Sequence, residues 1–151
     1  MGDKIYADYA KALAKYDLGL ELLVYGFAKT GQPNLFEVVN PGSISSHNLR
    51  GFAAIGSGSI MALAALNRKA LPATIGPLIY RLLDAKFSSE TAHDVGKKTF
   101  VITIDKAGKY GGMSQDYIEQ IRAIWDRNLK APEPADALEL INKSGAVNLA
   151  S

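Results

Sequence analysis

The chain has 151 residues, of which 48% are hydrophobic and 21% charged, and 17 Lys and Arg residues against 15 Asp and Glu give a net charge of +2. This length and hydrophobic content are sufficient for one ordinary domain with a buried core. The charge is small and spread along the chain, so the sequence argues against a nucleic acid or an anionic membrane as partner.

The chain contains no cysteine, which excludes disulfides, thiolate catalysis and cysteine-based metal sites. Its two histidines, His47 and His93, lack the HxxH or HExxH spacing of zinc sites, and we expect no metal or cofactor. The N-terminus has no signal-peptide pattern, and no apolar run approaches the roughly 20 residues of a membrane helix. Because a cysteine-free chain also suits a reducing compartment, we expect a cytoplasmic protein.

The N-terminal third predicts a helix followed by a β-hairpin. Tyr6, Tyr9, Leu13 and Tyr16 recur near helical spacing, and this pattern is more often part of a core than a cofactor contact. Two short apolar runs follow, separated by AKTGQP, whose Gly and Pro favour a tight connection. The expected elements are a helix over Asp3–Asp17, strands over Leu20–Phe27 and Asn34–Val39, and a loop over Asn40–Arg50 with an extended piece at Ser43–Ser45.

The remainder of the chain predicts alternating strands and helices. Apolar periodicity indicates the helices, and β-branched and aromatic residues indicate the strands. We expect a strand over Gly51–Ile55, helices over Ile60–Leu66 and Leu78–Phe87, a strand over Thr99–Asp105, a turn over Lys106–Gly112, and helices from Ser114 to about Trp125 and over Ala135–Asn142. The final residues, SGAVNLAS, are expected to be loosely held.

The segment Gly56-Ser57-Gly58-Ser59 joins a predicted strand to a predicted helix and has three interpretations. Its glycines allow positive φ and a close approach of helix to strand. The backbone N–H groups of a helix N-terminus also bind anions. Alternatively, Ser57 orients a neighbouring catalytic group. A dinucleotide fingerprint would need a third glycine where Met61 stands, and no Lys-Ser or Lys-Thr follows to make a P-loop.

The order of these motifs resembles a known family. LLVYGFAKTGQPNLFEVVNPGSI, GFAAIGSGSIMALAAL, two predicted helices and HDVGKKTFVITIDKAG follow one another as in the second half of proteasome β-type subunits and their bacterial relatives. The similarity covers about Leu20 to Gly108 and is most specific over Phe52–Leu66. It implies an α+β fold, the four-layer αββα sandwich of the N-terminal-nucleophile (Ntn) hydrolases, with residues 1–151 as a single domain that forms its C-terminal portion.

The same resemblance implies how such a domain acts. Members of the family cut peptides with an N-terminal Thr, Ser or Cys, and this chain begins with Met1 and Gly2. The nucleophile, its acidic partner and the catalytic lysine lie on early strands that have no counterpart here. We therefore expect no activity from this chain alone. Self-cleavage before Ser43 or Ser57 would expose a new N-terminus, but the cut before Ser57 would break the strand-to-helix turn, and we expect no internal activation.

Two auxiliary site residues carry over by resemblance only. Ser57 aligns with the family serine near the nucleophile, and Asp94 aligns with the acid that precedes the last core strand. Three residues after Asp94 the family often carries a serine, whereas this chain has Lys97. His93 and Asp94 are adjacent in sequence, and because neighbouring residues rarely face each other we expect no acid–base pair between them.

These observations leave three hypotheses for the function of the chain. The first is the C-terminal part of a threonine-type Ntn peptidase, acting on peptides once a partner chain supplies the N-terminal half. The alternative is a noncatalytic, proteasome-like structural subunit that self-assembles with copies of itself, through the Trp125 helix and the Pro-rich segment that follows it. A third is a small-molecule binder that uses the GSGS turn.

Overall fold

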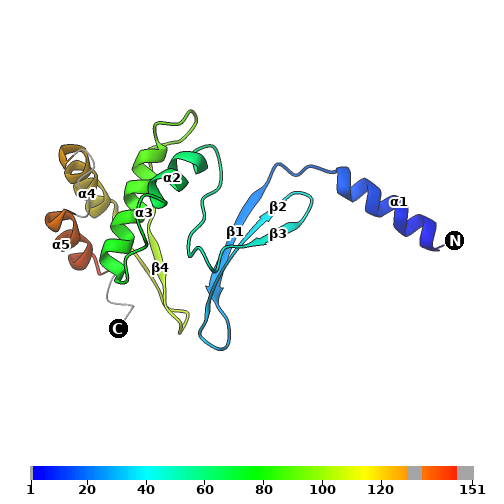
Figure 1. The fold of residues 1–151 in the computed structure, drawn as a ribbon, viewed down its shortest axis with the longest axis horizontal. Coiled ribbons are helices and arrows are strands. Elements are labelled where there is room, and N and C mark those ends of the chain that lie inside the picture. The colour runs from blue at the N-terminus through cyan, green and yellow to red at the C-terminus, as the bar shows by residue number, and fades with distance from the viewer. Residues whose placement is uncertain (1, 129–133, 146–151) are drawn as a thin grey trace. The chain divides into compact units, whose positions relative to one another are not determined.

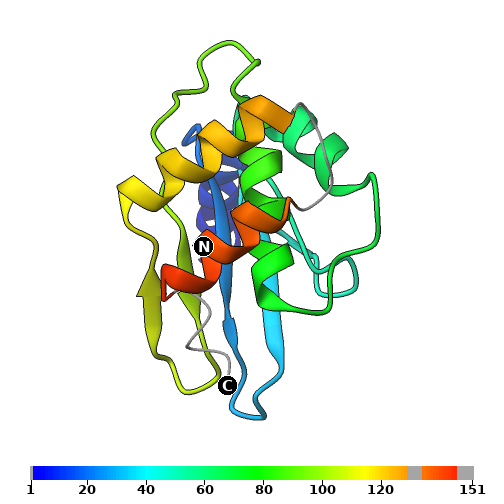
Figure 2. The ribbon, with the colours of Figure 1, turned by 90° about the vertical axis from the view of Figure 1, so that its left-hand side faces the viewer.

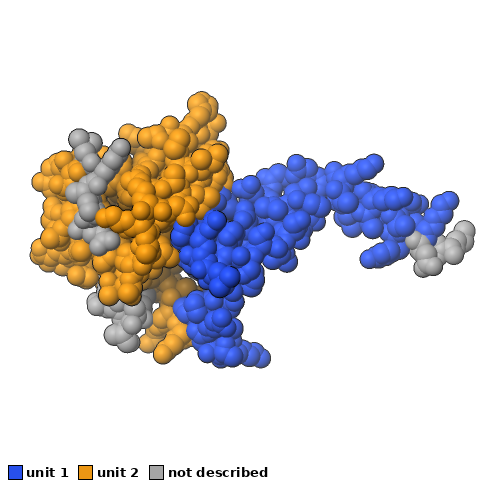
Figure 3. All heavy atoms as spheres, in the orientation of Figure 1, with its two compact units in different colours: residues 1–55 blue, residues 56–151 orange. Residues whose placement is uncertain are grey.

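The computed structural model describes residues 2–128 and 134–145, and this part of the chain contains five helices and two small antiparallel sheets (Figure 1). The fold is therefore mixed α+β. The chain divides into two compact units, residues 1–55 and residues 56–151, which are coloured separately in Figure 3. That residues 1–151 form one domain stays a prediction. Among the described residues, no helix has the length and apolar character needed to cross a membrane.

The first unit is a helix followed by a three-stranded sheet. Its elements are α1 (Gly2–Lys15), β1 (Glu21–Phe27), β2 (Pro33–Val39) and β3 (Ser43–Ser46), with strand order β1-β2-β3 and antiparallel pairing throughout. Gly31 adopts φ 80° in the β1–β2 turn, a conformation that favours glycine. The predicted helix and hairpin are confirmed, and the short extended piece is β3.

Both faces of this sheet carry apolar side chains. Side chains alternate along a strand, so the register places Leu22 and Val24 on one face with Val38 and Ile44, whereas the other face mixes Leu23, Tyr25 and Leu35 with Glu21 and Glu37. Leu22, Val24, Tyr25 and Ile44 are all more than half exposed. In addition, β1 is an edge strand with one side unpaired in the described sheet. Within the first unit, the described residues therefore leave apolar side chains of this sheet exposed.

The tyrosines of α1 are not part of a core. Tyr6 and Tyr9 are 78% and 68% exposed, and Leu13 and Tyr16 are similarly exposed. The helix itself is confirmed, but the core interpretation of its stripe is wrong for the described structure. The periodicity identified an apolar helix face correctly, and no element of the first unit covers that face along its length.

The second unit contains α2 (Ser59–Leu66), α3 (Ile75–Ser89), β4 (Ile102–Ile104), β5 (Tyr110–Gly112), α4 (Gln115–Asn128) and α5 (Ala135–Lys143). Figure 2 shows α4 and α5 lying over α3, with the β4–β5 hairpin beside them. Buried apolar side chains from these three helices, together with Met113 between β5 and α4, meet in one core, whose members are Ile79, Tyr80, Leu83, Phe87, Met113, Ile118, Ile121, Ile124, Ala137 and Ile141. The four helices predicted in this part of the chain are confirmed.

The strand predictions of the second half are partly wrong. Residues 51–55 form no strand, β4 spans only Ile102–Ile104, and Tyr110–Gly112 is a strand where we expected a turn. A β-strand is defined by its ladder partner, and in the described part of the chain nothing pairs with residues 51–55. The outward face of the β4–β5 hairpin leaves Phe100, Ile102 and Tyr110 exposed. This second sheet therefore also has an uncovered apolar face.

Candidate functional site

The GSGS segment forms a tight turn at the start of α2. Gly56 has φ 83°, which favours glycine, and its carbonyl accepts a hydrogen bond from the Ser59 N–H at 3.0 Å. Gly58 is the N-cap residue of α2, and its carbonyl accepts from the Ala62 N–H at 3.0 Å. Ser57, between the two glycines, is exposed. The turn therefore holds the Ser57 side chain at the surface on a fixed backbone.

Gly58 is in close contact with the C-terminal end of α3. A Cβ atom at this position would lie 2.9 Å from the Cβ of Ser89, closer than real Cβ atoms approach, and 3.0 Å from Cγ2 of Val95, a tight contact. This glycine is therefore required for packing, as the first interpretation of the motif proposed. The contact brings the turn against the segment that carries Asp94, 37 residues further along the chain.

Asp94 lies in the exposed loop that follows α3. Its φ is 67°, the left-handed region that few non-glycine residues adopt, although Asp is among those that tolerate it. His93 Nδ1 lies 2.7 Å from Asp94 Oδ2. Our expectation that these neighbours would not face each other is wrong, since the two side chains are within hydrogen-bond distance. Both side chains remain largely exposed, so the pair contributes little to stability.

Ser57 and Asp94 are brought to the same part of the second unit. Gly58 and Val95 are in contact, and each predicted site residue is the immediate chain neighbour of one of them. Both are exposed. A hydroxyl and a carboxylate at one surface can hydrogen-bond to a substrate or to a catalytic amine. They do not make a nucleophile by themselves, because serine needs an adjacent base that accepts its proton.

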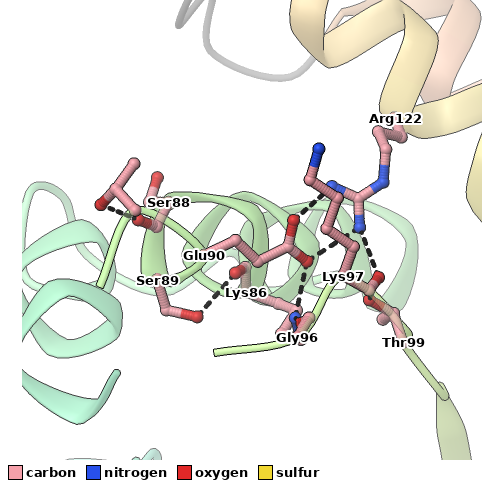
Figure 4. Close-up of polar contacts among 9 residues, drawn as sticks. Lys86, Ser88, Ser89, Glu90, Gly96, Lys97, Thr99 and Arg122 are labelled. Carbon is pink, nitrogen blue, oxygen red and sulfur yellow. Dashed lines mark hydrogen bonds and ion pairs between the residues drawn. The ribbon is translucent and has the colours of Figure 1, made fainter. Parts of the chain in front are cut away.

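A part-buried ionic cluster at the C-terminal end of α3 contacts the backbone of Gly96 and Lys97 (Figure 4). The Glu90 carboxylate, 6% exposed, accepts hydrogen bonds from Arg122 Nη1 at 2.6 Å, from Arg122 Nη2 at 2.8 Å and from Lys86 Nζ at 2.6 Å. We call Lys86, Glu90 and Arg122 the Glu90 cluster. Lys86 Nζ also donates to the Gly96 carbonyl at 2.7 Å, and Arg122 Nη2 donates to the Lys97 carbonyl at 2.9 Å. The cluster thereby ties the loop after Asp94 to α3 and α4.

The charges in this cluster stabilise one another. Burial alone would raise the pKa of Glu90, but the hydrogen bonds from Arg122 and Lys86 outweigh it and hold that pKa below its usual value. The hydrogen bond to Glu90 raises the pKa of Arg122. The Arg122 guanidinium also lies 4.1 Å from the centre of the Phe87 ring, a favourable cation–π distance. The carboxylate is therefore ionised at neutral pH.

Lys97 has a fixed backbone and an exposed side chain. Its carbonyl accepts from Arg122 and, at 3.2 Å, from the Thr99 hydroxyl. The backbone that carries the Lys97 ammonium group is therefore held in place three residues beyond Asp94. Proteasome β-type subunits often have a serine at the position that resembles Lys97. Glu90 and Arg122 were not predicted as site residues. The i,i+4 spacing of Lys86, in the predicted helix, and Glu90, three residues beyond its predicted end, was the available signal for half of the cluster.

Trp125 has a role inside the second unit. Its ring meets that of Phe87 edge to face with centroids 5.5 Å apart, and its Nε1–H donates to Asp84 Oδ1 at 2.8 Å. Both the apolar ring and its polar atom are thus occupied within the unit. The Pro-rich segment that we expected to join it in an interface begins at Pro132, which lies outside the described residues.

The described residues contain no group of three His, Cys, Asp or Glu side chains suited to hold a metal ion. Comparison with protein-family models, curated proteins and solved structures found no match to this chain.

Proposed function

We propose that residues 1–151 form the C-terminal part of a proteasome-like Ntn peptidase whose nucleophile lies on a segment outside them. The observation that carries the proposal is the incomplete sheet of the first unit. Its β1 strand carries exposed apolar side chains on both faces, and among the described strands it has a ladder partner on one edge only. Such a strand is energetically reasonable only in the interior of a larger sheet with layers on either side.

The αββα sandwich satisfies this requirement. In that architecture each sheet packs one face against helices and the other against a second sheet, so strands with two apolar faces are expected. The uncovered face of the β4–β5 hairpin fits the same arrangement. The ordered motifs between Leu20 and Gly108 add the resemblance to proteasome β-type subunits. We therefore propose the four-layer sandwich as the completed fold.

In this proposal Ser57 and Asp94 are auxiliary residues. The tight GSGS turn presents the Ser57 hydroxyl, and the Gly58 contact holds that turn beside the Asp94 loop. They would orient the α-amino group and the hydroxyl or thiol of an N-terminal nucleophile, which attacks the peptide carbonyl and forms an acyl intermediate that water then hydrolyses. The Glu90 cluster keeps the Asp94 loop in place.

The test is a covalent label for N-terminal nucleophiles, such as a peptide epoxyketone, combined with a peptide-cleavage assay on the protein isolated with its native partners. We expect cleavage, and labelling on the segment outside residues 1–151. Ser57→Ala should lower kcat by roughly tenfold or more with little change in KM, because the serine acts on the reacting groups. Ser59→Ala, in the same turn, is the matched control and should leave both unchanged.

A different outcome would support the other function. An assembly that neither cleaves peptides nor reacts with the label would contradict the peptidase proposal. It would fit the noncatalytic structural subunit, which Lys97 in place of the family's usual serine favours.

A further inference from the structure

The apolar stripe of α1 has the spacing of a helix that pairs with another helix. Tyr6, Tyr9 and Leu13, with Tyr16 just beyond the end of α1, follow a 3-4-3 spacing, the a/d pattern of paired helices. The opposite side of the helix carries the charged residues Lys4, Asp8, Lys11 and Lys15. An isolated helix of this length is marginal in water, so α1 needs a packing partner.

The stripe leads into an apolar pocket of the same unit. The pocket has a volume of about 310 Å³ and lies where α1 meets the sheet. Leu13 and Tyr16 line it from the helix side, and Leu18, Leu20, Leu22, Val38, Val39, Asn40, Pro41 and Gly42 complete its wall. Stripe and pocket are therefore one continuous apolar surface. The volume lies at the lower end of the range for ligand pockets and admits an aromatic side chain.

We propose that this surface is occupied by a second copy of the chain, with the two α1 helices antiparallel and their stripes in contact. In an antiparallel pair, the N-terminal end of each helix lies beside the C-terminal end of the other. Tyr6 of the second copy then reaches the pocket beside Leu13 and Tyr16 of the first, and the reverse contact fills the second pocket. The interface is thus self-complementary, as two-fold symmetry requires. Antiparallel helix dipoles add a small favourable contribution.

The exposed area is sufficient for a stable dimer. The three tyrosines, between 64% and 78% exposed, contribute about 400 Å² per copy. With Ile5, Leu13, Leu18 and Leu20 included, complete burial on two copies would reach roughly 1,500 Å² as an upper limit, which is close to the size of a standard specific interface. This inference rests on the α1 stripe and the adjoining pocket, whereas the proposed peptidase activity rests on the free edge of β1 and on the Ser57 and Asp94 turns, so either can fail without the other.

Sedimentation equilibrium across the micromolar range tests the proposal. We expect a dimer, and Tyr9→Glu should raise its Kd by at least about 100-fold because it places a charge in the centre of the interface. Lys11→Glu introduces the same residue on the opposite face of the same helix and should change Kd by less than about threefold. A monomer at every concentration, or an equal response to the two variants, would overturn the proposal.

A cross-link tests the antiparallel geometry. The chain has no cysteine, so a Tyr6→Cys/Leu18→Cys variant contains only the two introduced thiols. Mild oxidation should give a covalent dimer linked between residue 6 of one copy and residue 18 of the other. Lys4→Cys/Leu18→Cys, whose first thiol lies on the charged face, should form this dimer at least tenfold more slowly. Disulfides within one chain, or equal rates for the two variants, would refute the arrangement.

Discussion

The Glu90 cluster gives the sharpest prediction about stability. Glu90→Gln keeps the size and shape of the side chain but removes the negative charge that three hydrogen bonds from Arg122 and Lys86 reach. The carboxylate is 6% exposed, so the loss leaves two cations facing a neutral amide at a nearly dry position. The variant should therefore destabilise the second unit even though no cavity is formed.

The magnitude follows from burial. Removal of one partner from a buried ion pair costs about 3–5 kcal/mol. Because Arg122 and Lys86 keep 21% and 29% side-chain exposure, water relieves part of that cost, and we expect the low end, about 3 kcal/mol at pH 7. Urea unfolding followed by the fluorescence of Trp125, the only tryptophan, reports on this unit directly.

The matched control is Glu139→Gln. Glu139 forms an i,i+4 pair with Lys143 in α5, but both side chains are more than 60% exposed, so we expect no measurable loss of stability. The pKa of Glu90 is lowered in the folded state, so its ionised form stabilises the protein above pH 4.5, and this stabilisation is lost as the pH falls below that value. Equal effects of the two variants at pH 7, or a difference that persists unchanged at pH 2, would refute the reasoning.

Three further predictions concern the second unit and use the same unfolding assay. Gly58→Ala should cost about 1–3 kcal/mol by overpacking against α3, whereas Gly96→Ala, with open space around its Cβ, should be neutral; equal costs would contradict the close-packing argument. Burial, with Asp84 and Asp136 nearby, raises the pKa of Tyr80 to about 12, so its contribution to stability is complete below pH 10 and is lost as the pH rises toward 12. In Tyr80→Phe, the free energy of unfolding should fall by roughly 2–3 kcal/mol less between pH 10 and pH 12 than in the wild type. An unchanged decrease over this pH range would refute the prediction. Because Asp94 has φ 67°, Asp94→Gly should leave the free energy of unfolding unchanged or raise it by up to about 1 kcal/mol, whereas Asp94→Val should lower it by about 1–2 kcal/mol. The reverse order would show that the backbone is not strained there.

Local sequence signals predicted the helices and the first hairpin well. In α3 and α4 the apolar periodicity alone identifies the buried stripe. A helix satisfies its own backbone hydrogen bonds, so its position does not depend on a partner far away in the sequence. In β1 and β2 the β-branched residues and the Gly31 turn act together. These elements depend mainly on residues within one segment, which is why their positions follow from the sequence.

Strand extent and side-chain pairing did not follow from the sequence. Residues 51–55 have strand-like composition but no ladder partner among the described residues, whereas Tyr110–Gly112 contains two glycines and is a strand because β4 pairs with it. Glu90 and Arg122 are 32 residues apart, and only the packing of α4 on α3 brings them together. The close contact of Gly58 with Ser89 likewise depends on tertiary packing.

The most direct test of the proposed function is native mass spectrometry of the protein isolated from its source, followed by denaturing mass and N-terminal sequencing of each component. We predict that residues 1–151 are accompanied, in equal number, by a segment whose first residue is Thr, Ser or Cys. Finding these residues assembled only with copies of themselves, with no such segment present, would contradict it.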